Sequence, residues 1–153
     1  MSYNVHNGKR VKYFVSESIF PQTIDVIKTK AFALGIELEI GKPSEFNFDA
    51  AKEYAGLIVQ NPDNLGNVVD FSDLASKLKK DKVVFTVIQD ILSLCLFKPP
   101  GEIGADICCG SAQRMGIPMA FGGPHPGFMA CTDKYKRKMP GRIIGVSKDV
   151  HGN

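Results

Sequence analysis

The sequence lacks the features of membrane and exported proteins. No uninterrupted apolar run approaches the roughly 18 residues that a membrane-spanning helix needs. The first ten residues, MSYNVHNGKR, are polar and do not resemble a secretory signal peptide. The 44% hydrophobic and 23% charged residues are ordinary for a soluble globular protein. These features predict no membrane partner.

Metal-binding patterns are missing as well. His6, His125 and His151 are scattered along the chain, and none has a carboxylate partner at the spacing of a zinc protease. The four cysteines match no zinc pattern, so we expect no metal site. They sit among apolar residues, which predicts reduced, buried core residues of an intracellular protein. A rare disulfide between Cys108 and Cys109 is the alternative. The cysteines are Cys95, Cys108, Cys109 and Cys131.

Phosphate-binding and nucleic-acid signatures are weak. No GxGxxG follows the first predicted strand and no GxxxxGK[ST] occurs, so the sequence lacks a dinucleotide fingerprint and a P-loop. The net charge is only +3. Short basic clusters at 79–82 and 134–138 are typical of solvated helix faces. We therefore expect no nucleic-acid partner, and binding through KYKRK is the third-ranked alternative.

The sequence does contain alternating strand and helix patterns. Apolar, β-branched runs predict strands at 11–17, 36–40, 55–61 and 82–88. Apolar residues at helical spacing predict a helix over 21–34, which ends at Gly35, and another that starts at Asp70 as its N-cap. A short helical turn is expected over 49–54. This order predicts a three-layer, doubly wound, mainly parallel α/β sheet, formed as a single domain over 1–153.

The pattern changes after Asp90. This residue directly follows the strand at 82–88, at the carboxyl edge where doubly wound sheets bind ligands, although Asp is also an ordinary strand-ending residue. Further on, the sequence predicts short strands at 105–109 and 126–132 and a short basic helix over 133–141. A last strand is expected at 142–149.

The glycine-rich run from Gly122 to Gly127 allows several interpretations. Its backbone N–H groups could cradle a phosphate, or Gly and Pro could simply form a tight turn between two strands. A third possibility is that Gly122 and Gly123 line a cavity. His125 either hydrogen-bonds inside the turn or belongs to a site.

Four segments in this order resemble one enzyme family. They are FPQTIDVIKTKA, NPDNLGNVVDF, LCLFKPPGEIGADICCGSAQRMGIPMAFGGPHPGFMA and MPGRIIGVSKDVHG. Together they resemble glycine dehydrogenase (decarboxylating), the P-protein of the glycine cleavage system, and most closely its N-terminal half or subunit 1. The resemblance runs from about residue 10 to residue 152, and the block 99–145 is its most specific part. It implies the large domain of fold-type-I, pyridoxal-phosphate-dependent transferases, of which this chain would be a fragment.

The resemblance also implies that this chain lacks a catalytic residue. In the family, only the C-terminal half keeps the Schiff-base lysine, in a stretch like LHKTFCIPHGGGGPG. Aligning its Ile-Pro with Ile117-Pro118 places that lysine on Gln113, whose carboxamide cannot form an imine. The neighbouring Arg114 stays protonated and cannot replace it. Asp90 falls near the carboxylate that pairs with the cofactor's ring nitrogen.

The implied cofactor site is vestigial or cavity-lining and comprises Asp90, Gly122, Gly123 and His125. The whole enzyme would decarboxylate glycine with pyridoxal phosphate and pass the aminomethyl group to lipoylated H-protein. The cofactor is not expected on this chain. The implied partners are the catalytic C-terminal half or subunit 2 and H-protein, in a homo- or hetero-oligomer. The compartment would be the bacterial cytoplasm, or the mitochondrial matrix in a eukaryote. The alternative is a stand-alone α/β ligand-binding or scaffolding domain without enzymatic activity.

Overall fold

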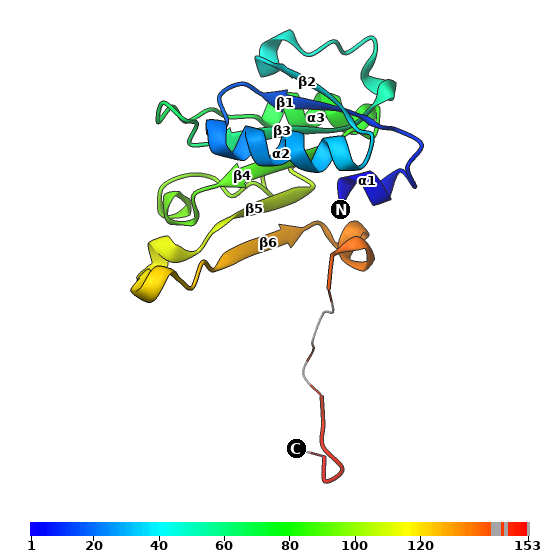
Figure 1. The fold of residues 1–153 in the computed structure, drawn as a ribbon. Helices are drawn as coiled ribbons and strands as arrows, with labels where there is room; N and C mark the ends of the chain where they lie inside the picture. Colours follow the sequence, from blue (N-terminus) through cyan, green and yellow to red (C-terminus); the bar gives the residue numbers. More distant parts are fainter. Residues whose placement is uncertain (142–144, 146, 153) are drawn as a thin grey trace.

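The computed structural model describes residues 1–141, 145 and 147–152. In this part of the chain, six strands form one sheet in the order β2-β1-β3-β4-β5-β6 (Figure 1). Neighbouring strands are parallel except β5 and β6, which are antiparallel. The strands are β1 (Lys12–Ser16), β2 (Glu37–Gly41), β3 (Tyr54–Asn61), β4 (Val84–Gln89), β5 (Ile107–Ser111) and β6 (Gly127–Cys131).

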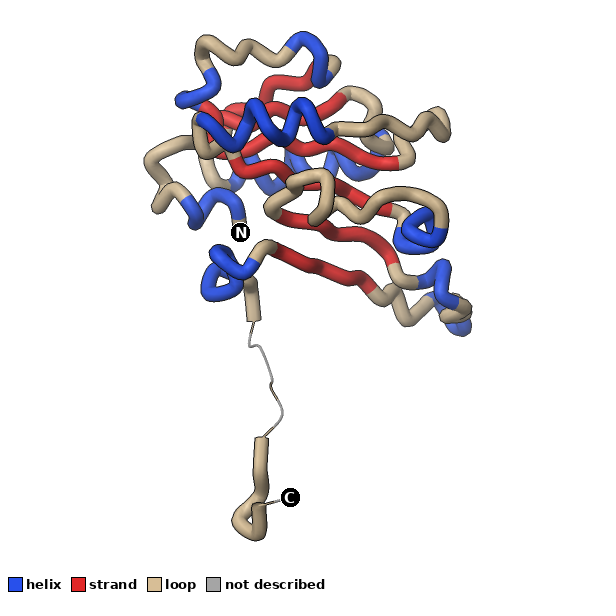
Figure 2. Tube along the Cα trace, turned by 180° about the vertical axis from the view of Figure 1, so that it is seen from behind, coloured by secondary structure: helices blue, strands red, loops and turns tan. Residues whose placement is uncertain are grey.

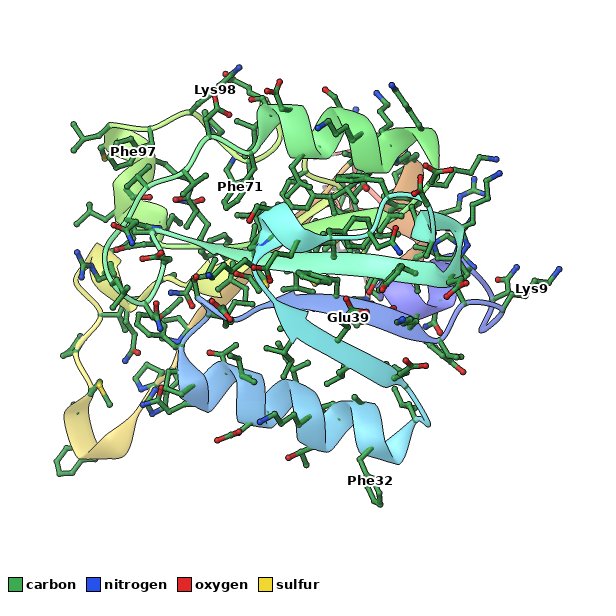
Figure 3. The ribbon with its side chains drawn as sticks, turned by 90° about the horizontal axis from the view of Figure 1, so that it is seen from above. Lys9, Phe32, Glu39, Phe71, Phe97 and Lys98 are labelled. Atoms are coloured by element: carbon green, nitrogen blue, oxygen red, sulfur yellow. The ribbon has the colours of Figure 1, made fainter. Side chains whose placement is uncertain are left out.

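Two helices cover opposite faces of this sheet. Helix α2 (Pro21–Ala33) connects β1 to β2, and α3 (Ser72–Lys80) connects β3 to β4 on the other face (Figure 3). The three-layer, doubly wound, mainly parallel prediction is therefore confirmed. Because the two crossovers run in opposite directions from the centre of the sheet, the direction of winding reverses between β1 and β3.

The main core lies between the sheet and α3. Phe14, Leu57 and Phe85 stand in register on β1, β3 and β4, and each is almost fully buried. Leu78 of α3 and the ring of Phe46 complete the same cluster, with Phe46 edge-on to Phe14 at 5.4 Å between ring centroids. Burial of each such side chain contributes about 1.5–3 kcal/mol to folding.

The opposite helix, α2, packs less deeply. Its one buried residue is Ala31, and Phe32 is 90% exposed and points away from the sheet (Figure 3). Leu34, the last residue of the predicted helix, is also exposed. Gly35 has a left-handed φ of +63°, and the Ile36 N–H bonds to the Ala31 carbonyl oxygen, so the predicted helix end is confirmed.

Some local expectations need correction. The backbone places the N-cap of α3 at Phe71, one residue after the predicted Asp70, and the Phe71 side chain makes no capping hydrogen bond. The Asp70 carboxylate still accepts hydrogen bonds from the N–H and hydroxyl of Ser72, the first residue of the helix. The turn expected over 49–54 is a 3-10 helix, η2 (Ala51–Glu53), and Tyr54 already belongs to β3. In the strand predicted at 142–149, residues 142–144 and 146 lie outside the described part of the chain, and residues 145 and 147–149 are not in a strand.

The first and last helices of the described chain meet at one corner. The basic segment over 133–141 forms the 3-10 helix η6 (Asp133–Lys138), beside α1 (Ser2–Val5) (Figure 1, Figure 2). The sequence did not predict α1. Among the described residues, no helix has the length and hydropathy to cross a bilayer.

The cysteines are all free, but the prediction that they are buried is wrong for Cys95. Cys95 is exposed because it ends η3 (Ile91–Cys95), a surface 3-10 helix. Cys108, Cys109 and Cys131 are only partly buried. They lie on β5 and β6, whereas α2 packs against β2 and α3 against β4.

Candidate functional site

Asp90 lies at the carboxyl edge of the sheet, directly after β4. Its Oδ1 accepts a hydrogen bond of 3.0 Å from the Leu92 N–H, which makes Asp90 the N-cap of η3. Its backbone N–H bonds to the carbonyl oxygen of Asn61, the last residue of β3. Asp90 therefore ends a strand and caps the following 3-10 helix, as its interpretation as an ordinary strand-ending residue predicts.

The other carboxylate oxygen of Asp90 faces a cation from the chain itself. Arg114 Nη2 lies 3.6 Å from Asp90 Oδ2, and the two side chains are 60% and 31% exposed. Arg114 belongs to the 3-10 helix η4 (Gln113–Met115), which packs beside η3. The tertiary structure thus gives Asp90 an ionic partner 24 residues further along the chain.

Gln113 ties η4 to the glycine-rich run. Its Nε2 donates a hydrogen bond of 3.2 Å to the carbonyl oxygen of Pro124, and its backbone N–H donates to Ser111 Oγ. The Ala112 N–H also bonds to the carbonyl oxygen of Pro126. These contacts hold the segments on both sides of Gly116 together as one compact corner.

The glycine-rich run is a turn that leads into β6. Gly122 has a left-handed φ of +84°, and Gly123 is extended before the cis peptide bond to Pro124. His125 Nε2 lies 2.9 Å from the Gly122 carbonyl oxygen, and its side chain is exposed. A strand follows rather than a helix, so these backbone N–H groups do not form the loop-to-helix anion site typical of phosphate-binding proteins.

The predicted site residues therefore form one edge of the molecule. Asp90 contacts this edge through Arg114, and Gln113 reaches the Gly122–His125 turn through Pro124. Among the described residues, no group of three or more His, Cys, Asp or Glu side chains is placed to hold a metal ion.

These residues do not fit a covalently held pyridoxal phosphate. The segment from Asp106 to Thr132 contains no lysine, and a carboxamide at position 113 supplies no amine for an imine. Asp90 Oδ1 caps η3, and its Oδ2 faces the Arg114 guanidinium. Both oxygens of the carboxylate are thus engaged by the chain itself.

The sequence of the chain matches a known family over its full length. The model of the family described as glycine cleavage system P-protein matches residues 1–153. This chain belongs to the glycine cleavage system P-protein family. The resemblance seen in the four sequence segments is therefore confirmed.

Individual P-protein relatives agree with this assignment. The chain is 48% identical to glycine dehydrogenase (decarboxylating) of Photobacterium profundum, over 95% of this chain and 15% of the relative. It is 49% identical to the enzyme of the same name from Nostoc sp., over 99% of this chain and 15% of the relative. The chain thus spans about 15% of the length of these curated relatives.

Solved structures support the fold. A crystal structure of glycine decarboxylase (P-protein) of the glycine cleavage system, in inhibitor-bound form, superimposes with a TM-score of 0.86 at 32% identity. That match covers 99% of this chain and 35% of the other. Cystathionine gamma synthase from Xanthomonas oryzae pv. oryzae matches with a TM-score of 0.65 at 17% identity, over 83% of this chain and 33% of the other. The fold is that of the fold-type-I, pyridoxal-phosphate-dependent enzymes.

Sequence reasoning missed a second group of polar residues at the same edge. Ser16 ends β1, and Gln60 and Asn61 end β3; all three are buried. The signal was available, because polar residues at the ends of two apolar strands have the same position as Asp90 after β4. Ser16 and Gln60 line a separate crevice.

Proposed function

We propose that this chain is a non-catalytic part of a glycine dehydrogenase (decarboxylating). In this proposal it belongs to the N-terminal half or subunit 1 of the P-protein. It forms part of the large domain of that half, supports the catalytic half and shapes a cavity shared between them. Gln113, at the aligned position of the family lysine, carries this proposal.

Two features support an inactive site. Gln113 donates to Pro124, so its side chain serves as a structural link within the corner. Arg114 faces Asp90 and supplies the positive charge that a protonated ring nitrogen would otherwise present to this carboxylate. In this proposal Asp90, Gly122, Gly123 and His125 are the edge of a former cofactor site, and no catalytic step passes through them.

The rest of the reaction belongs to the partners. Pyridoxal phosphate, bound by the catalytic C-terminal half or subunit 2, supplies the electron sink for glycine decarboxylation. Lipoylated H-protein receives the aminomethyl group. The complex is a homo- or hetero-oligomer, in the bacterial cytoplasm or in the mitochondrial matrix of a eukaryote.

Covalent trapping of the cofactor tests the absence of a Schiff-base lysine. The purified chain is mixed with pyridoxal phosphate and reduced with borohydride, and the adducts are mapped by peptide mass spectrometry. We expect only scattered, substoichiometric labelling of exposed lysines. A stoichiometric adduct on one lysine of this chain would falsify the proposal.

Two variants test the assignment of position 113. Gln113→Lys places an amine at the aligned lysine position, and Gln22→Lys places one at an exposed position of α2 as the matched control. We expect more adduct at position 113 in the first variant than at position 22 in the second. Equal labelling of the two positions would remove the basis for assigning Gln113 to the lysine position.

Reconstitution tests the supporting role. Release of carbon dioxide from carboxyl-labelled glycine is measured with this chain alone, and then with the catalytic half of a P-protein and lipoylated H-protein. We expect no release by this chain alone and a stable complex with the catalytic half in a pull-down. Failure of the two to associate would contradict the proposed partnership.

A further inference from the structure

A crevice of about 500 Å³ opens at the carboxyl ends of β1 and β3, on the α3 side of the sheet. Ser16 and Gln60, at the ends of these two strands, form its floor. The winding of the sheet reverses between the same two strands. Doubly wound sheets bind their ligands at this switch point, and the volume is in the range of small-molecule sites.

One wall of the crevice is apolar and firmly held. It includes Phe48, Val69, Phe71 and Leu74. Phe71 is only 9% exposed and packs edge-on against Phe85 of the core, at 6.2 Å between ring centroids. It lies at the start of α3, on the face of the sheet opposite α2 (Figure 3). Phe71 belongs to the core cluster and Phe48 and Leu74 pack against it, so this part of the wall is held without a ligand.

The floor offers a buried hydroxyl. Ser16 is 2% exposed, and its Oγ accepts a hydrogen bond of 3.3 Å from the Ser18 N–H. This contact uses one of the two acceptor lone pairs of the hydroxyl, so Ser16 Oγ can also accept a hydrogen bond from a donor in the crevice. Both polar atoms of the Gln60 side chain are hydrogen-bonded within the chain. Oε1 accepts from the Phe20 N–H, and Nε2 donates to the Pro62 carbonyl oxygen. The Gln60 side chain therefore holds the loops that follow β1 and β3 and is not one of the groups that we expect to bind a ligand.

The charge of the crevice is opposite to that of the chain. The crevice is lined by three carboxylates and one ammonium group, which belong to Asp63, Asp70, Asp73 and Lys77. Their net charge is −2, whereas the net charge of the whole chain is +3. Hydrogen bonds from Asn67 lower the pKa of Asp63, and hydrogen bonds from Ser72 lower the pKa of Asp70. Both carboxylates are therefore ionised at neutral pH.

Stabilisation of the start of α3 explains only two of the three carboxylates in the crevice. Asp70 and Asp73 stabilise the positive end of the α3 dipole. Asp63 lies nine residues before the helix, in a loop that its own hydrogen bonds to Leu65 and Asn67 hold in place. The ammonium of Lys77 lies 5.4 Å from the centre of the Phe48 ring, where a cation–π contact holds it.

We propose that this crevice binds a small organic cation with an apolar body, of the class of aromatic primary amines. The apolar body packs against Phe48 and Phe71, and the ammonium group faces Asp70 and Asp73. The site shares no residue with the Asp90, Gln113 and Gly122–His125 edge. The inference is therefore independent of the role of the chain in glycine decarboxylation.

A matched ligand series tests the charge and place of binding. The ¹⁵N-labelled chain is titrated with 2-phenylethylamine, with its neutral analogue 2-phenylethanol and with anionic phenylacetate. We expect shifts of the Ser18, Ser44 and Leu74 amides, with affinity decreasing from the amine to the alcohol to the acid. Equal or tighter binding of the alcohol or the acid, or shifts confined to other residues, would overturn the proposal.

Two conservative variants test the carboxylates. Asp70→Asn keeps an acceptor for Ser72, and Asp73→Asn changes an exposed residue, so both variants should fold. We expect each to weaken binding of 2-phenylethylamine about two- to fivefold, the range of a partly exposed charge pair. Asp25→Asn, on exposed α2, is the control and should bind like the unmodified chain. Unchanged affinity in both test variants would also overturn the proposal.

Discussion

Gln113 Nε2 donates a hydrogen bond to the carbonyl oxygen of Pro124, 3.2 Å away. This side-chain contact spans a loop that the Ala112 N–H and the Pro126 carbonyl oxygen also bridge, and the two contacts together close the corner beside Asp90. We propose that position 113 aligns with the cofactor lysine of the P-protein family. In this chain its side chain has a structural contact instead.

The two oxygens of Asp90 should differ in their importance for stability. Asp90→Ala removes the cap of η3 and should lower the free energy of unfolding by about 1 kcal/mol. Arg114→Gln removes only an ion pair with exposed members and should cost about 0.5 kcal/mol or less. Urea unfolding followed by circular dichroism measures both values. An equal loss in the two variants would show that the ion pair, not the cap, is the main contribution.

Gly110 should not tolerate a side chain. A Cβ at this position of β5 would overlap the carbonyl oxygen of Gln89 on β4 and lie 2.8 Å from the ring of Phe128 on β6. We expect Gly110→Ala to cost about 3 kcal/mol, the upper range for overpacking, because a strand backbone cannot move aside. Gly101→Ala is the control, since its Cβ would meet no atom within 4 Å, and its cost should stay within about 0.5 kcal/mol. Similar unfolding midpoints for both variants would contradict this packing.

The cysteines should react with Ellman's reagent in a defined order. Burial, together with the neighbouring Cys109, raises the pKa of Cys108 to about 11, and burial also raises the pKa of Cys109. Cys95 is exposed, so it should give the fast phase at mildly alkaline pH. Cys95→Ser should abolish that phase, and Cys109→Ser should leave it unchanged. A fast phase that persists in Cys95→Ser would refute the order.

The Lys134–Asp106 ion pair should make stability depend on alkaline pH. The ammonium lies 2.7 Å from Asp106 Oδ1. Burial lowers the pKa of Lys134, but the hydrogen bond and charge of Asp106 raise it more, so the net pKa is above its ordinary value. Because the folded-state pKa is the higher one, this stabilisation is complete below about pH 10 and is lost as the pH rises through the folded-state pKa.

Lys134→Met tests this dependence. At neutral pH it should lower the free energy of unfolding by about 1 kcal/mol, and the difference from the unmodified chain should shrink above about pH 10.5. Lys136→Met is the control, because Lys136 pairs with the highly exposed Asp133 and should have a smaller effect. A difference that stays constant from neutral to strongly alkaline pH would argue against the ion pair as its cause.

Local sequence patterns were sufficient to predict most strands of the sheet. Residues 55–61 and 82–88 are mostly apolar, and they form β3 and β4 because strands covered on both faces bury most of their side chains. The end of α2 at Gly35 was also predictable, since a left-handed residue there suits glycine. The start of α3 was harder to predict. Asp70 and Phe71 are adjacent, and only the backbone geometry decides which of them occupies the N-cap position.

Contacts between distant segments could not be predicted in this way. The pairing of Asp90 with Arg114 depends on η3 and η4 lying side by side, and no local pattern in either segment indicates it. The crevice likewise combines residues from the ends of β1 and β3 with residues of α3. Such sets form only when the sheet order brings the strand ends together.

The sequence by itself determined the family, the strand and helix alternation and the absence of an amine at position 113, because these depend on residue identity and local spacing. Only the tertiary structure decided which groups meet. It placed the Arg114 guanidinium opposite Asp90 and tied Gln113 to Pro124. It also gathered the carboxylates of Asp63, Asp70 and Asp73 around an apolar crevice. Charge and hydrogen bonding act over a few ångströms in space, whatever the separation along the chain.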